Sequence, residues 1–248
     1  MGVQKTLRLL SFITLVIFAA FSSAVDTKNR MSAHHESAPI VAETDREIIE
    51  KSIHSAVRVV STMVYGDTES LTSTSSGTYF THNNRTYVVT AAHSLIGGCD
   101  ETMIVAGEYV YHCIDMVTLD QNRDIGIMEI EKIFNKKPIN IRDILYSEKE
   151  TKNNTAVHEK LYYTGYPQGH GPFTFDGKIV SHRIENGLFF AHSYAWSGSS
   201  GSGVFNSQGK LVGIITAVSV ANTEYGIDVM EDLIIVTPIN LLDFQDVL

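Results

Sequence analysis

Residues 198–205 read Gly-Ser-Ser-Gly-Ser-Gly-Val-Phe and place a serine among closely spaced glycines, directly before an apolar run. A serine hydroxyl is a weak nucleophile at neutral pH, so it needs an imidazole to accept its proton and a carboxylate to orient that imidazole. Two earlier stretches contain these groups: residues 88–93, Val-Val-Thr-Ala-Ala-His, and residues 124–130, Asp-Ile-Gly-Ile-Met-Glu-Ile. The candidate catalytic residues are therefore Ser200, His93 and Asp124.

The residues around each candidate indicate a β-strand that could position it. Residues 87–90 are apolar or β-branched and would end a strand just before His93, whereas residues 125–130 alternate and would start one just after Asp124. The glycines have a backbone role, because acyl transfer places negative charge on a substrate oxygen and preorganised N–H groups must point at it. We expect the N–H groups of Gly198 and Ser200 to form this oxyanion hole.

Each motif also has an ordinary structural explanation. A histidine can simply end a strand, a Ser/Gly run is usually a flexible loop, and an aspartate before a strand is usually a cap. All three motifs occur here in the order His, Asp, Ser, and each has a compatible strand beside it. This combination favours the catalytic interpretation over three unrelated coincidences.

In this order the motifs resemble the catalytic signatures of the trypsin-like serine proteases with the chymotrypsin fold. The resemblance implies an all-β protein of two antiparallel six-stranded β-barrels, with the active site between them. The family pattern of Gly, Asp or Asn, Ser, Gly places the nucleophile at Ser200 rather than at its neighbouring serines. Residues 163–167, Tyr-Thr-Gly-Tyr-Pro, and residues 177–181, Gly-Lys-Ile-Val-Ser, resemble segments of HtrA-type protease domains.

The HtrA-type resemblance covers roughly residues 45–241, and few residues follow it. We therefore expect no C-terminal PDZ module. The sequence departs from the family at Ser199, where Asp or Asn is usual, and at Gly203, where Pro is usual. In digestive trypsins, an acid at the position of Ser199 pairs with the new N-terminus that activation creates. Because Ser199 is not acidic, we expect no such activation switch here. Both departures could loosen the oxyanion loop, which leaves a non-catalytic binding protein on the same fold as the alternative, and an esterase as a more distant one.

The resemblance also locates the pocket that receives the P1 side chain of a substrate. It assigns Tyr194, six residues before the nucleophile, and the strand around Thr216 and Val218 to this pocket. Tyr194 provides no carboxylate to pair with a basic P1 residue, and the branched Val218 would narrow the pocket. We therefore expect small or medium aliphatic P1 residues.

Length and composition set the broad class. A chain of 248 residues with 44% hydrophobic residues can bury a large core, and short β-branched stretches between Gly, Asn, Asp and Ser turns favour barrels or sandwiches. The net charge of −9 without a basic cluster argues against nucleic acid, so we expect protein or peptide substrates as partners. The sequence contains no HExxH motif or Cys/His cluster, and we expect neither metal nor other cofactor. The oligomeric state is open.

The N-terminus has the features of a secretory signal. Lys5 and Arg8 precede an apolar stretch, residues 9–21, which is followed by Ser-Ser-Ala at residues 22–24. We expect cleavage after Ala24, membrane contact only during export, and a secreted or periplasmic protein; an uncleaved anchor is the lesser alternative. Export leads to an oxidising compartment, where Cys99 and Cys113 could form a disulfide, although two free buried thiols are also compatible with the sequence.

The organisation predicted along the chain is as follows. Residues 1–24 are the signal peptide, 25–42 a flexible leader, 43–146 a helix and the first barrel, 147–156 a linker, and 157–248 the second barrel. Thr44 and Glu47 fit a capping box at the start of the helix, and residues 67–76 read as a polar loop. The strands are expected at residues 57–65, 77–81, 85–90, 103–106, 109–118 and 125–130, and then at 160–164, 173–181, 188–192, 203–206, 211–218 and 234–238.

Overall fold

The computed structural model describes residues 43–66, 69–145, 147–182, 187–224 and 226–242. The predicted signal peptide and leader lie outside the described residues, so both stay predictions. Within the described residues, no helix has the length and apolar character needed to cross a membrane.

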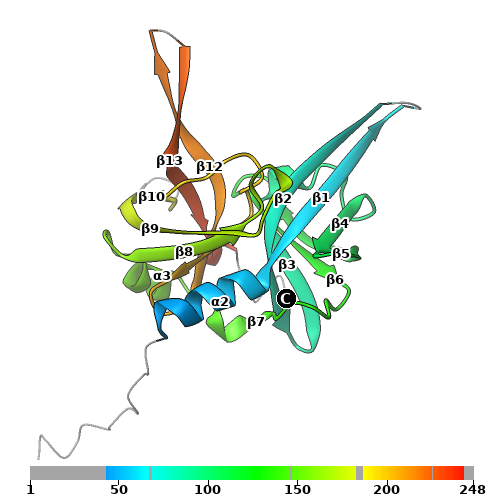
Figure 1. Cartoon of the computed structure of the whole chain (residues 1–248), viewed down its shortest axis with the longest axis horizontal. Coiled ribbons are helices and arrows are strands. Elements are labelled where there is room, and N and C mark those ends of the chain that lie inside the picture. Colours follow the sequence, from blue (N-terminus) through cyan, green and yellow to red (C-terminus); the bar gives the residue numbers. More distant parts are fainter. Residues whose placement is uncertain (1–42, 67–68, 146, 183–186, 225, 243–248) are drawn as a thin grey trace, which may run out of the picture. The chain divides into compact units, whose positions relative to one another are not determined.

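The first barrel consists of six antiparallel strands in the order β1-β4-β5-β6-β3-β2, and pairing of β1 with β2 closes it (Figure 1). A short strand, β7, adds to β2 in parallel. Residues that alternate along these strands point inward and form an apolar interior, which includes Val59, Tyr79 and Met128. The strands are β1 (Ala56–Tyr65), β2 (Glu69–His82), β3 (Arg85–Thr90), β4 (Thr102–Ala106), β5 (Tyr109–Asp120), β6 (Ile125–Ile130) and β7 (Ile139–Asn140).

The second barrel is a closed antiparallel sheet in the order β10-β13-β12-β11-β8-β9. Its strands are β8 (Lys160–Gly165), β9 (Phe173–His182), β10 (Phe189–His192), β11 (Gly203–Asn206), β12 (Leu211–Thr223) and β13 (Gly226–Pro238). The two closed barrels confirm the predicted fold class, which is that of the chymotrypsin-like proteins.

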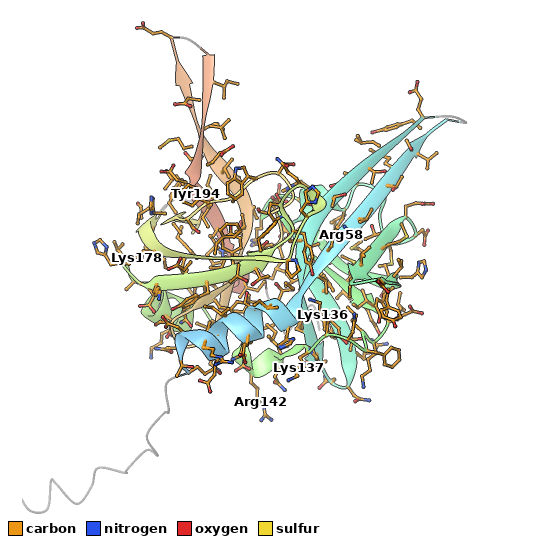
Figure 2. The ribbon with its side chains drawn as sticks, in the orientation of Figure 1. Arg58, Lys136, Lys137, Arg142, Lys178 and Tyr194 are labelled. Carbon is orange, nitrogen blue, oxygen red and sulfur yellow. A yellow bond between two sulfur atoms is a disulfide. The ribbon has the colours of Figure 1, made fainter. Side chains whose placement is uncertain are left out.

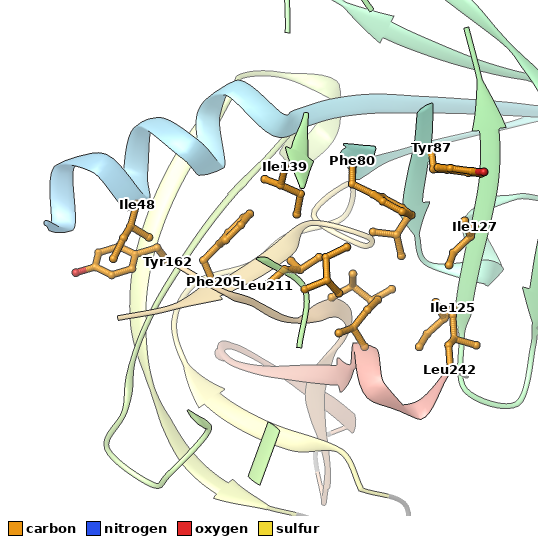
Figure 3. Close-up of a cluster of buried hydrophobic side chains, with 14 residues drawn as sticks. Ile48, Phe80, Tyr87, Ile125, Ile127, Ile139, Tyr162, Phe205, Leu211 and Leu242 are labelled. Carbon is orange, nitrogen blue, oxygen red and sulfur yellow. The ribbon is translucent and has the colours of Figure 1, made fainter. Parts of the chain in front are cut away.

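Helix α2 (Asp45–Ser55) precedes the first barrel and begins at the predicted capping box. The Thr44 side chain accepts the N–H of Glu47, whose carboxylate accepts the N–H of Thr44. Ile48 on this helix is fully buried in an apolar cluster to which both barrels contribute (Figure 3). Its other buried members are Phe80, Tyr87, Val89, Ile125, Ile127, Ile139, Ile144, Tyr162, Phe205, Leu211, Ile214, Ile239 and Leu242. This cluster is the core between the barrels.

The prediction of a polar loop was wrong over residues 69–76, because β2 begins at Glu69 and pairs with β1 from Glu69 to Thr78. The serines and threonines here are compatible with a strand, and the Thr62 and Thr72 hydroxyls form a cross-strand hydrogen bond of 3.2 Å. Strands β12 and β13 also extend beyond their predicted ends. Figure 1 shows that both hairpins project beyond their barrels. The apolar side chains on these extensions, such as Val220 and Val229, are therefore exposed and do not fill a barrel interior.

The predicted linker contains a short helix, α3 (Glu148–Asn154). The sequence of this helix has no apolar periodicity from which it could be predicted. Hydrogen bonds from threonine hydroxyls help to hold it instead. The buried Thr151 hydroxyl donates to the carbonyl of Leu145 at 3.1 Å, and the buried Thr155 hydroxyl donates to that of Thr151 at 2.8 Å.

The predicted disulfide between Cys99 and Cys113 is present, with Cα atoms 5.3 Å apart. It joins the segment that follows His93 to strand β5. The disulfide therefore closes a loop within the first barrel, on the barrel that carries two of the candidate catalytic residues.

Candidate active site

His93 and Asp124 form a close pair on the first barrel. His93 lies in a short 3₁₀ turn, Ala92–Ser94, just after β3, and Asp124 lies just before β6. Asp124 Oδ2 is 2.7 Å from His93 Nδ1, and Asp124 Oδ1 accepts the backbone N–H of His93 at 2.8 Å. A carboxylate at Nδ1 favours the tautomer protonated there, which leaves Nε2 able to accept a proton.

The backbone of Asp124 adopts a conformation that is uncommon for a residue other than glycine, with φ of 56°. Such left-handed residues cost free energy and persist where the surrounding structure holds them. Here the Asp120 carboxylate accepts the N–H groups of Asn122 and Arg123 at 3.0 and 2.9 Å, which organises the preceding turn. The turn thereby presents both carboxylate oxygens of Asp124 to His93.

The hydrogen bond from Asp124 raises the pKa of His93 above its usual value of 6.5, and partial desolvation of the ring opposes this effect. The side chain of His93 is 48% exposed, against 27% for Asp124. The histidine ring is thus open to a second reactant while the carboxylate that orients it is more protected.

The candidate nucleophile Ser200 lies in the loop before β11, next to two glycines with positive φ, Gly198 at 93° and Gly201 at 83°. A Cβ on Gly201 would lie 2.2 Å from the carbonyl oxygen of Ser76 and 2.9 Å from the nitrogen of Ala91. Only glycine therefore allows the loop to approach the first barrel this closely. Ala91 is two residues before His93, so the loop brings Ser200 next to the segment that carries the histidine.

Two backbone N–H groups beside the nucleophile donate no hydrogen bond within the part of the chain that the structure describes. The carbonyl of Ser197 accepts the N–H of Gln168 at 2.6 Å. In a trans peptide the C=O and N–H groups point in opposite directions, so the N–H of Gly198 points away from Gln168. Across the described part of the chain, neither this N–H nor that of Ser200 has a protein acceptor. Such unpaired donors are what an oxyanion hole requires.

The predicted pocket residues all lie on the second barrel, but they differ in burial. Thr216 is buried and its hydroxyl lies 3.0 Å from that of Thr237, while Val218 packs against the apolar cluster of this barrel. Tyr194, labelled in Figure 2, is instead 54% exposed. Its ring stacks on that of Trp196 with 6.1 Å between ring centroids. The Tyr194 carbonyl accepts the hydroxyl of Tyr163. The ring of Tyr194 therefore lies at the surface rather than at a buried pocket floor.

Sequence reasoning missed three residues at this site: Ser76, Gln168 and Trp196. Ser76 is buried and bonded to the nucleophile loop, but it lay in the stretch interpreted as a loop. Gln168 follows the Gly-Tyr-Pro segment, which could have drawn attention to it. The Trp196 indole donates to the Glu231 carboxylate at 2.8 Å, and its position four residues before Ser200 was the available signal.

Comparisons with known proteins agree with this fold. A family model described as a trypsin-like peptidase domain matches residues 75–214, more than half of the chain, and spans all three candidate catalytic residues. Rv3671c from M. tuberculosis H37Rv, in the inactive form of a serine-to-alanine mutant, aligns with a TM-score of 0.55 and 14% identity over 81% of this chain and 87% of its own.

A second similar structure is the HtrA-type protease AlgW with a bound tripeptide. It aligns with a TM-score of 0.60 and 16% identity over 80% of this chain and 61% of its own. The present chain thus spans less than two thirds of the AlgW chain. At these identities both similarities concern the fold.

Proposed function

Because the chain belongs to the family of trypsin-like peptidase domains, we propose that it is a serine endopeptidase whose nucleophile is Ser200. The observation that carries this proposal is the pairing of His93 Nδ1 with Asp124 Oδ2 at 2.7 Å, on the segment against which the Ser200 loop packs. A protease acts on proteins or peptides, so the substrate is a polypeptide.

In the proposed reaction, His93 Nε2 removes the proton of Ser200 Oγ as this oxygen attacks the substrate carbonyl. The carbonyl π bond opens to an oxyanion, which the N–H groups of Gly198 and Ser200 stabilise, while Asp124 stabilises the imidazolium. The imidazolium then protonates the leaving amine as the C–N bond breaks. Water, deprotonated by His93, attacks the acyl-enzyme and releases the acid and free Ser200 by the reverse proton transfer.

For specificity, we propose that a pocket beside Thr216 and Val218, with Tyr194 at its exposed rim, accepts small or medium aliphatic P1 side chains. The branched Val218 limits the available width. Tyr194 offers no carboxylate for a basic P1 residue, which would then be desolvated without a partner.

We also propose that the protein is exported and acts outside the cytoplasm. The signal-like residues 1–24 and the Cys99–Cys113 disulfide support this location, because disulfides persist mainly in oxidising compartments. Terminal sequencing of the exported protein tests it: a mature chain starting at Val25 is expected, and retention of residues 1–24 would contradict cleavage.

The alternative function is peptide binding without turnover on the same fold. The N–H groups of Gly198 and Ser200, which have no acceptor among the described residues, favour catalysis over this alternative, since a collapsed oxyanion loop would pair them.

A peptide library containing all P1 residues, with cleavage products identified by mass spectrometry, tests the proposal. The wild type is expected to cleave after small or medium aliphatic residues, and the Ser200→Ala variant to be inactive. Ser197→Ala is the matched control, because Ser197 is an exposed serine of the same loop; it should retain activity. Peptide binding by folded wild type without products would favour the alternative, and cleavage of esters alone would indicate an esterase.

A further inference from the structure

Ser76 connects the first barrel to the nucleophile loop through its backbone and its side chain. It is fully buried on β2. Its N–H donates to the carbonyl of Ser200 at 2.9 Å, and its hydroxyl donates to the carbonyl of Gly198 at 2.7 Å. One residue thus holds two carbonyl groups of the loop that contains the nucleophile.

Two further hydrogen bonds hold Ser76 in place. Its Oγ accepts the N–H of Tyr166 at 2.8 Å, and its carbonyl accepts the hydroxyl of Thr90 at 2.6 Å. The Ser76 hydroxyl is therefore oriented: because it accepts from Tyr166, its proton is directed to Gly198. Thr90 ends the strand that leads to His93. Ser76 therefore also joins the nucleophile loop to the segment that carries the histidine.

These bonds restrain the peptides on either side of those that would form the oxyanion hole. Gln168 holds the Ser197 carbonyl, and Ser76 holds the carbonyls of Gly198 and Ser200. The Gly198 N–H and the Ser200 N–H belong to two different peptides. Each of these peptides is adjacent to one whose carbonyl Ser76 restrains. Because peptide units are planar, each donor N–H can turn relative to its restrained neighbour only through the φ and ψ angles of the residue between the two peptides.

We propose that Ser76 is a positioning residue that holds the oxyanion loop, residues 197–201, in the conformation required for catalysis. This inference rests on the proposed function and assigns a further residue to the same site. Ser76 contacts no reacting atom; it acts through the backbone of Gly198 and Ser200.

The adjacent Ser75 provides a matched control. It is 2% exposed, and its Oγ has no hydrogen-bond partner in the portion of the chain that the structure describes. Ser75→Ala and Ser76→Ala remove the same atom from neighbouring buried positions on one strand, but only Ser76→Ala breaks a bond to the nucleophile loop.

The test compares wild type, S75A and S76A after titration of active sites with a fluorophosphonate, with kcat expressed per titrated site. Loss of an oxyanion donor lowers kcat by about 100-fold or more, and S76A leaves the donor present but less restrained. We therefore expect S76A to lower kcat by about 10- to 100-fold, with KM and the pH midpoint of kcat/KM unchanged. S75A should match the wild type. A merely structural role of Ser76 would change the number of titrated active sites in S76A and leave the turnover of each site unchanged.

Equal turnover per site in S76A and S75A would overturn this inference alone, whereas absence of labelling in folded wild type would overturn both this inference and the proposed function. A crystal structure of the wild-type phosphonate adduct tests the inference even if S76A does not fold. The bond from Ser76 Oγ to the Gly198 carbonyl is expected to persist in the adduct, and a Gly198 carbonyl turned away from Ser76 would contradict the proposal.

Discussion

At the scale of single residues, the contact between His93 and Asp124 determines how the site depends on pH. The carboxylate raises the pKa of His93 above 6.5, and catalysis needs the neutral ring. We expect kcat/KM to fall as the pH drops through this raised pKa. Asp124→Asn should move the acidic limb to lower pH and reduce kcat by about 10⁴-fold. A pH profile of both proteins checks this, and an unmoved limb would contradict it.

The same pair contributes to stability in a defined pH window. Since the folded pKa of His93 is raised, its contribution is fully present below the unfolded value near 6.5 and is lost as the pH rises through the folded value. Urea denaturation should therefore show a larger loss for Asp124→Asn at pH 5.5 than at pH 9. Asp232→Asn is the control, because Asp232 lies 3.8 Å from His192 in an exposed pair expected to contribute little.

Gly201 tests the close approach of the nucleophile loop to the first barrel. Gly201→Ala combines a positive φ with a Cβ only 2.2 Å from the Ser76 carbonyl, whereas Gly98→Ala has a positive φ and open space around it. We expect a loss of about 1–2 kcal/mol for Gly98→Ala from its conformation alone. Gly201→Ala should lose about 1–3 kcal/mol more through overpacking, and should lose fluorophosphonate labelling. Similar unfolding free energies for the two variants would contradict the close approach.

Residue types identified the candidate catalytic residues because the chemistry allows few alternatives. Histidine, aspartate and serine have distinct roles, and the glycines near Ser200 mark an unusual backbone. Ser76 could not be identified in the same way. It is adjacent to Ser75 and has the same side chain, and only contact with a loop more than a hundred residues later distinguishes the two.

At the scale of elements, the strands inside the barrels were predictable because alternating apolar residues fill the interior. Their exposed extensions were not, since β2 starts with four exposed residues and β13 with six. Backbone pairing sustains these extensions outside the packed barrel interiors. Helix α2 was predictable because both its capping box and its apolar positions are local signals.

Helix α2 is expected to contribute to stability through Ile48 in the core between the barrels. Ile48→Ala should lower the free energy of unfolding by about 2–5 kcal/mol, because it leaves a cavity in a fully buried position. Ile49→Ala is the matched control, since Ile49 is only partly buried beside the same cluster, and it should cost less. Chemical denaturation measures both, and equal losses would contradict the packing of α2.

The disulfide should stabilise the first barrel without taking part in catalysis. Cys99 and Cys113 are 14 residues apart, and the chain-entropy model assigns about 3 kcal/mol to a loop of this length. The double variant Cys99→Ser with Cys113→Ser should therefore unfold at a lower temperature and retain kcat under folding conditions. Unchanged thermal stability, or full stability with lost kcat, would contradict this role.

At the scale of the whole molecule, two closed barrels pack together on a shared apolar cluster and meet at the candidate site. The first barrel carries His93 and Asp124, and the second carries Ser200. The resemblance to a known family predicted this arrangement, whereas composition and periodicity alone favoured barrels or sandwiches without distinguishing them. The contacts between barrels depend on packing across distant segments, which local patterns do not report.

The most direct test of the central claim is fluorophosphonate labelling of the purified protein, with Ser200→Ala and His93→Ala beside the wild type. A serine activated by a histidine reacts with this probe, whereas an ordinary hydroxyl does not. Labelling of wild type that is lost in both variants is the expected result. Folded wild type that does not react would contradict an activated serine, and label that survives Ser200→Ala would show that another residue is the nucleophile.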